Sequence, residues 1–269
     1  MFEWFDEDFD AMELVEGALI LNKAVNPETE DEWARQELAR LLTQAKHELA
    51  NEQDEKQRFE ALLHLFYQQW GFRGDREAYF DSRNAFIDKV LQHRKGIPVS
   101  LGALLLYFAR KLGFPLQGIT FPTQFLLQLH WCDESPIYIN PFTGETVSLH
   151  ILQAWLVGHK GVLSKLKSSH LQVTDNPTVI GRWLALLKSA LLREERYTLA
   201  LRCTDLALTF VPDDPYEIRD RGFIYQQLDC HQIALSDYQY FIDHCPNDPA
   251  AELLKNQVNA LSFEAITLH

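Results

Sequence analysis

The chain has 269 residues, of which 46% are hydrophobic, so it is long enough for a full core and for one or two domains. Its formal net charge of −13 argues against a nucleic-acid partner, because binding phosphates requires a positive surface. Residues 1–60 hold 17 Asp and Glu against 6 Lys and Arg, which is most of the excess negative charge. Solvated helix faces explain this excess most simply, and a docking edge for a basic partner is the alternative.

Four cysteines form neither a C-x-x-C pair nor a Cys/His cluster with the spacing of zinc ligands. We therefore expect free thiols in a reducing compartment, with no metal and no other cofactor. The acidic start of the chain lacks the positive region of a signal peptide, and no apolar run approaches the roughly 20 residues that span a bilayer. These observations predict a cytoplasmic protein without a membrane partner. The cysteines are Cys132, Cys203, Cys230 and Cys245.

Amphipathic helices are expected in the first third of the chain. A helical pattern covers residues 12–22, and Thr29 is placed to cap the next helix, with Glu32 as its capping-box partner. Another amphipathic segment ends at Gly71, a residue suited to the left-handed backbone after a helix. A loop and a short helix over residues 85–92 then lead into the central part of the sequence.

The central stretch, residues 94–145, is the part around which the chain is organised. After a glycine-proline turn, apolar residues recur at three- and four-residue steps over residues 99–112, which predicts a buried helix. Ser100 falls in its first turn. Two β-like runs follow, over residues 117–131 and 137–142, and a polar turn separates them. A serine at a helix start, followed by polar residues on adjacent strands, can hold a nucleophile, a base and an orienting group.

The last third of the sequence repeats itself. Pro212-Asp213-Asp214-Pro215 recurs 34 residues later as Pro246-Asn247-Asp248-Pro249, and this is the period of tetratricopeptide repeats. Lys188 is an exception to the pattern, because it stands where the first helix of the first unit should carry a small glycine. A final helix over residues 249–262 is expected to cap the stack. Two repeats are fewer than the three usually needed for independent stability.

Five motifs precede the repeats in a fixed order, and they resemble the transglutaminase-like superfamily, in its branch of bacterial SirB-type proteins. The resemblance implies an α+β architecture: a transglutaminase-like (papain-like) domain with a small antiparallel sheet over residues 1–160, then an all-α tetratricopeptide-like array over residues 177–269. The motifs are Gly71-Phe72-Arg73-Gly74 with Tyr79, Arg94-Lys95-Gly96-Ile97-Pro98-Val99-Ser100-Leu101, Arg110-Lys111-Leu112-Gly113, Phe121-Pro122-Thr123-Gln124-Phe125 and Asn140-Pro141-Phe142.

The resemblance also assigns three site positions. Active members of the superfamily use a cysteine at a helix start, a histidine on the next strand and an aspartate on the strand after it. By motif, these positions fall at Ser100, Gln124 and Asn140. Serine is a poor nucleophile unless a base removes its proton, and a glutamine amide cannot accept that proton. Asparagine can orient an imidazole, but none is present here, so the implied triad is degenerate.

Another histidine could supply the missing base. His130 would lie roughly 20 Å along the predicted strand from position 124, at about 3.3 Å per residue, which is out of hydrogen-bond reach. His93 precedes the glycine-proline turn and His150 begins the next expected helix, and no spacing supports either of them as the base.

The three site positions also have readings without catalysis. Ser100 can cap the helix, Gln124 can satisfy backbone groups at a strand end, and Asn140 with Pro141 can form a turn. The same residues could instead line a polar pocket that binds a small ligand or a peptide end. The sequence leaves both readings open.

We favour the hypothesis of a non-catalytic accessory or regulatory protein that binds a protein or peptide, through the repeats or through the cleft near Ser100. The alternative is a hydrolase or acyl-transferase of transglutaminase-like type that uses Ser100 with an unrecognised base. A purely structural subunit is a third option. The identity of the partner and the oligomeric state stay open. Tyrosines of the repeats can line a peptide groove or pack between helices: Tyr216, Tyr225, Tyr238 and Tyr240.

Overall fold

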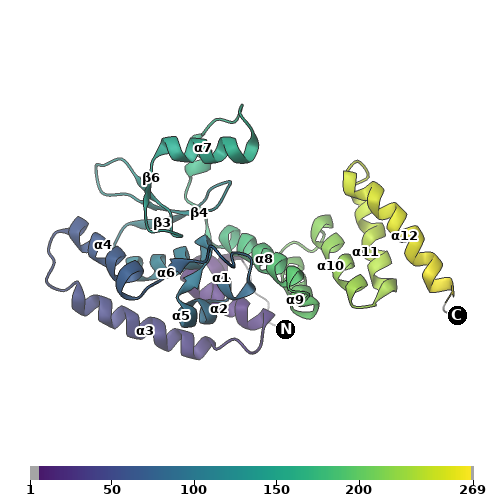
Figure 1. Cartoon of the computed structure of the whole chain (residues 1–269), viewed down its shortest axis with the longest axis horizontal. Coiled ribbons are helices and arrows are strands. Elements are labelled where there is room, and N and C mark those ends of the chain that lie inside the picture. The colour runs from purple at the N-terminus through teal and green to yellow at the C-terminus, as the bar shows by residue number, and fades with distance from the viewer. Residues whose placement is uncertain (1–5, 268–269) are drawn as a thin grey trace. The chain divides into compact units, whose positions relative to one another are not determined.

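The computed structural model describes the backbone of residues 6–267 and the side chains of residues 9–258. The chain divides into two compact units, Met1–Trp183 and Leu184–His269. Figure 1 shows a mixed first unit of helices and a small sheet, and a second unit made of helices alone. The expected α+β domain followed by a helical array is therefore confirmed.

Helix α6 (Pro98–Lys111) forms the centre of the first unit. Leu101, Leu104, Leu105 and Phe108 on this helix are completely buried, as their three- and four-residue spacing predicts. The helix contacts other helices as well as two strands of the sheet. The other helical segments described up to residue 93 are α1 (Asp6–Ala11), α2 (Leu14–Val25), α3 (Asp31–Glu48), α4 (Glu55–His64), η1 (Leu65–Gln69), η2 (Ser82–Asn84) and α5 (Ile87–His93).

Thr29 does not cap helix α3. The N-cap residue is Glu30, which makes no side-chain cap bond, so the predicted capping box with Glu32 is absent. Thr29 is instead buried, and its hydroxyl donates to the carbonyl oxygen of Asn22 at 3.1 Å. The side-chain oxygen of Asn22 also accepts from the backbone N–H of Ile87 at 2.8 Å. Thr29 is therefore part of a buried tertiary contact and is not available as a helix cap.

The main sheet has four antiparallel strands in the order β3-β4-β5-β6. The run over residues 117–131, expected as one strand, contains two, because the chain turns between residues 121 and 124 and pairs back on itself. Ile119 and Leu126 are register partners that belong to one core cluster with residues of helix α7 (Leu149–Lys160). The strands are β3 (Leu116–Thr120), β4 (Phe125–Leu129), β5 (Ile137–Ile139) and β6 (Thr146–Val147).

A second, two-stranded sheet lies beside the start of helix α6. Strands β1 (Arg73–Gly74) and β2 (Lys95–Gly96) pair in parallel. Gly71 ends the helical segment before them with a left-handed backbone (φ +74°), as its position in the sequence predicted. This short sheet fixes the chain immediately before the first turn of α6.

The first unit extends beyond residue 160, where the sequence predicted that it would end. Leu166 and Leu171, in the segment that follows α7, pack on the cluster that joins the sheet and α7, so this segment is part of the unit. Helix α8 (Asn176–Arg193) then begins within the first unit, and Trp183 donates its indole N–H to the carbonyl oxygen of Ala85 at 2.9 Å. The division between the two units falls inside α8, after Trp183, and not between residues 160 and 177.

The second unit continues with α9 (Tyr197–Phe210), α10 (Pro215–Gln227), α11 (His231–His244) and α12 (Pro249–Thr267). Gly222 on α10 lies so close to α11 that an added Cβ would stand 3.0 Å from Asp237 and Tyr238, which is why the repeat needs a small residue there. Lys188, at the corresponding position of α8, is instead buried with its Nζ atom 2.8 Å from Glu217 and 2.7 Å from Asp220 of α10. At this position α8 therefore carries an ion-paired lysine where α10 carries a glycine.

Two further expectations concern membranes and metals. None of the helices in the described part of the chain has the length and apolar character needed to cross a bilayer. Over those same residues, His, Cys, Asp and Glu side chains form no group of three or more that could hold a metal ion. The thiols of Cys132 and Cys230 are exposed, and that of Cys203 is buried.

Candidate functional site

The hydroxyl of Ser100 is completely buried at the start of helix α6. Its Oγ atom accepts a hydrogen bond from the backbone N–H of Ile97, the N-cap residue, at 3.1 Å. The same hydroxyl lies 2.7 Å from the carbonyl oxygen of Asn84 and 3.1 Å from that of Ile97, to which it can donate. A third-position side chain that reaches back to the N-cap N–H is one half of a capping box.

This environment leaves the Ser100 hydroxyl little freedom for chemistry. A nucleophilic serine needs its proton facing a general base and its oxygen facing a substrate. Here the neighbours of the hydroxyl are backbone groups, and carbonyl oxygens cannot act as general bases near neutral pH. Gly96 closes one side, because a Cβ there would stand 2.7 Å from the Ser100 oxygen. The hydroxyl therefore joins the start of α6 to the η2 segment.

Asn140 shapes the turn that follows strand β5. Its side-chain oxygen accepts from the N–H of Phe142 at 3.0 Å, and its carbonyl oxygen accepts from Gly144 at 2.8 Å. The hydroxyl of Tyr67 donates to the carbonyl oxygen of Pro141 at 2.8 Å, and burial raises the pKa of this hydroxyl. Asn140 therefore makes a local asparagine turn, which two other segments of the chain hold in place.

Gly74 is the second clamp on this turn. Its N–H donates to the carbonyl oxygen of Phe142 at 3.0 Å, and an added Cβ would stand only 2.4 Å from the Phe142 ring. Glycine is needed here because the ring packs directly on the backbone. The first and last motifs of the resemblance thus meet in space.

Gln124 lies half-buried in the turn before strand β4. The structure places its neighbour Phe125 against helix α6, where a Cβ on Gly102 would stand 2.6 Å from the Phe125 ring and 3.4 Å from Pro141. The segments that carry positions 100, 124 and 140 therefore come together around Gly102. Across the described chain, however, no hydrogen bond links any two of these three side chains.

The histidines considered as replacement bases lie elsewhere. His130 follows strand β4 and Gln124 precedes it, so the two residues are at opposite ends of that strand. His150 is exposed on α7, and His93 is exposed at the end of α5. In the part of the chain that the structure describes, none of them hydrogen-bonds the Ser100 hydroxyl.

Two residues important to this geometry had no signal in the sequence. Asn84 holds Ser100 through a backbone carbonyl, and any residue type could supply that group. Tyr67 lies in the π-helical turn after α4, and its aromatic character, which many residues of the chain share, gave no reason to single it out. Gly74 and Phe142, in contrast, both belong to motifs that the resemblance identified.

Two polar pockets lie beside the β1–β2 sheet. One has a volume of about 490 Å³ and the other about 270 Å³, and both are lined by Asp75, Glu77 and Lys95. Lys95 is 3.7 Å from Asp75, so these groups partly neutralise each other. Neither pocket is lined by Ser100, Gln124 or Asn140 themselves.

Comparison with known proteins identifies both parts of the chain. The family model of the transglutaminase-like superfamily matches residues 32–185, and that of the tetratricopeptide repeat matches residues 187–259. A UPF0162 protein of Vibrio cholerae is 79% identical over the whole of both chains. Protein SirB1 of Salmonella typhimurium is 39% identical, and the UPF0162 protein YchA of Escherichia coli K12 is 40% identical, each over 98% of both chains.

No solved structure matches this chain. The two family models cover the two parts of the fold in the expected order, and the relatives are similar along almost their full length. The chain therefore belongs to the UPF0162/SirB1 family, in which a transglutaminase-like core precedes a tetratricopeptide-repeat region.

Proposed function

We propose that this chain is a non-catalytic accessory protein that binds a segment of another protein through its helical repeats. The transglutaminase-like unit then serves as a folded scaffold without acyl-transfer chemistry. One observation carries the first half of the proposal: the Ser100 hydroxyl is buried among the backbone groups of Ile97 and Asn84.

The chemistry of the other two positions supports the same view. Gln124 offers an amide, which cannot take a proton from a hydroxyl at physiological pH, and the Asn140 oxygen is occupied by the Phe142 N–H. General-base assistance contributes about 10²–10⁴-fold to catalysis. A site that lacks both an exposed nucleophile and a base keeps neither half of the triad mechanism.

One face of helix α10 supports a binding role for the repeats. Tyr216, Arg219 and Phe223 are spaced by three and four residues, so they share one side of the helix. Arg219 lies over the Tyr216 ring, with 5.3 Å between its guanidinium carbon and the ring centre. Tyr216 and Phe223 are exposed, and aromatic and arginine side chains are the types that most often dominate protein interfaces.

Activity-based labelling tests the non-catalytic half of the proposal. Full-length protein and its Ser100→Ala variant are treated with serine-reactive and thiol-reactive probes, and the adducts are mapped by mass spectrometry. We expect no adduct at Ser100. A probe adduct at this residue that disappears in the alanine variant would instead favour a hydrolase or acyl-transferase.

Site-specific photo-crosslinking in cells tests the binding half. A photoreactive residue replaces Phe223 on α10, or Ile233 on α11 as the matched control, since these side chains are 41% and 45% exposed. We expect a protein adduct of defined mass from position 223 and none from position 233. Equal crosslinking from both positions, or none from position 223, contradicts binding at this face of α10.

A further inference from the structure

A turn with an apolar tip follows helix α7. The N–H of Ser164 donates to the carbonyl oxygen of Gly161 at 3.0 Å, which places Val162 and Leu163 at the two central positions of a β-turn. Their side chains are 85% and 92% exposed. Central turn positions usually hold Gly, Pro, Asn, Asp or Ser, and two aliphatic side chains gain nothing from facing water.

The turn is held firmly on α7. The side chain of Gln153 donates to the carbonyl oxygen of Ser164 at 2.7 Å and accepts from the N–H of Leu166 at 2.6 Å. Leu166 packs on the core cluster between the sheet and α7. The same loop thus buries one leucine and presents Val162 and Leu163 outward on a braced backbone, so their exposure is a feature of the fold.

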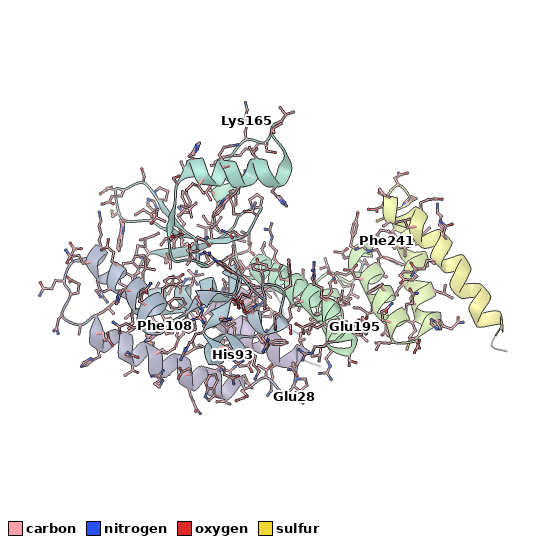
Figure 2. All side chains as sticks on the ribbon, viewed as in Figure 1. Glu28, His93, Phe108, Lys165, Glu195 and Phe241 are labelled. Atoms are coloured by element: carbon pink, nitrogen blue, oxygen red, sulfur yellow. The ribbon has the colours of Figure 1, made fainter. Side chains whose placement is uncertain are left out.

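The surroundings of the turn are positively charged within an acidic protein. From Thr146 to Thr174 the chain has three lysines and no Asp or Glu, although the whole chain has a formal net charge of −13. All three lysines are exposed, and Figure 2 labels one of them, Lys165, in the loop beyond α7. Within the described residues, none of the three forms an ion pair. They are Lys160, Lys165 and Lys167.

We propose that this turn docks on the surface of a bilayer that contains anionic phospholipid. Val162 and Leu163 enter the boundary between head groups and acyl chains, and the three lysines lie at the level of the lipid phosphates. Two neighbouring apolar side chains on a projecting turn suit a deformable lipid surface, whereas a protein partner would have to offer a fitted pocket. The local positive charge favours an anionic surface.

This contact is peripheral, shallow and reversible. The expectation that the chain has no membrane partner relied on the absence of a spanning segment, and that absence does not concern two side chains at a surface. The acidic remainder of the chain is repelled by anionic lipid, so the contact is limited to the turn and its lysines. Binding should therefore weaken as added salt screens the lysines.

Vesicle co-sedimentation of the full-length chain tests the proposal. Vesicles of phosphatidylcholine alone are compared with vesicles in which phosphatidylglycerol replaces part of it. We expect sedimentation only with the anionic vesicles, and less of it at higher salt. Val162→Ser combined with Leu163→Ser should lower the apparent affinity about tenfold or more, and replacing the three lysines with glutamine should do the same.

The matched control replaces Val211 and Leu253 with serine, since both are exposed aliphatic residues outside this loop. We expect this control to bind as the unchanged chain does, and circular dichroism checks that each variant is folded. Equal binding by the two double variants overturns the proposal, and so does a lack of binding to anionic vesicles. A protein adduct from a photoreactive residue at position 163, without vesicle binding, would assign the turn to a protein partner instead.

Discussion

The Ser100 hydroxyl and the carbonyl oxygen of Asn84 are 2.7 Å apart in a fully buried environment. This hydrogen bond connects the first turn of α6 with the η2 segment that ends at Asn84. The resemblance to active transglutaminase-like proteins assigns their nucleophile position to this serine. The same place in the fold thus serves here to join two backbone segments.

Replacing Ser100 with alanine should destabilise the first unit. The change leaves the N–H of Ile97 and the carbonyl of Asn84 buried without their partner, which typically costs about 1–3 kcal/mol. Urea unfolding followed by circular dichroism measures the difference. Thr43→Ala is the control, because the Thr43 hydroxyl is exposed and bonds only within its own helix, so a change below about 0.5 kcal/mol is expected there. If Ser100→Ala changes the free energy of unfolding as little as Thr43→Ala does, the Ser100 hydroxyl does not stabilise the first unit.

Two glycine substitutions should have opposite effects. Gly74→Ala places a Cβ 2.4 Å from the Phe142 ring and should cost about 1–3 kcal/mol, since the ring or the backbone must shift to make room. Gly158→Ala meets no atom within 4 Å and lies near the end of α7, where alanine favours the helix by up to about 1 kcal/mol. Thermal unfolding of both variants checks the prediction, and a Gly74 variant as stable as the parent contradicts the clamp on the Asn140 turn.

Lys188 should make the free energy of unfolding of the second unit decrease at alkaline pH. Burial by itself lowers the pKa of this lysine, but Asp220 and Glu217 together outweigh burial, so the pKa is raised overall. A raised lysine pKa stabilises the fold fully below the ordinary value of about 10.4, and this contribution is lost as the pH rises through the folded-state value.

The variant Lys188→Met tests the two ion pairs that Lys188 forms with Glu217 and Asp220. It should cost about 1–3 kcal/mol near neutral pH, because Glu217 and Asp220 lose their shared partner. Urea midpoints of variant and parent should converge above about pH 10.4. Lys255→Met, whose ion pair with Glu252 is exposed, should change stability by less than about 0.5 kcal/mol. If the difference in urea midpoint between the parent and the Lys188 variant stays constant up to the most alkaline pH, the ion pairs of Lys188 do not account for the lost stability.

Local patterns predicted the elements of the fold well where one rule dominated. The spacing of Leu101, Leu104, Leu105 and Phe108 predicted a buried helix, and all four are completely buried. The run over residues 117–131 misled, because Pro122 is a single turn signal inside an otherwise β-like run, and the chain reverses there. Thr29 misled because a buried contact with Asn22 prevailed over a local cap.

The motifs identified the segments around the candidate site but did not specify the contacts of its side chains. The motifs located Ser100, Gln124 and Asn140 on segments that do meet around Gly102. The partner of Ser100, however, is a backbone carbonyl 16 residues earlier in the chain, and no sequence spacing specifies such a contact. The departure at Lys188 was visible in the repeat pattern, but its ion pairs depend on how α10 packs against α8.

Thiol accessibility at position 100 tests the central claim most directly. In a Ser100→Cys variant, iodoacetamide labelling is followed by mass spectrometry, with exposed Cys132 and Cys230 as internal references that react. Buried Cys203 is the reference for protection, since burial raises its pKa to about 12. We predict that the thiol introduced at position 100 stays as protected as Cys203 in the folded protein and reacts only after unfolding in urea. If the thiol at position 100 is labelled in the folded protein as fast as Cys132, this position is accessible to a reactant. That result would contradict a buried, non-catalytic Ser100.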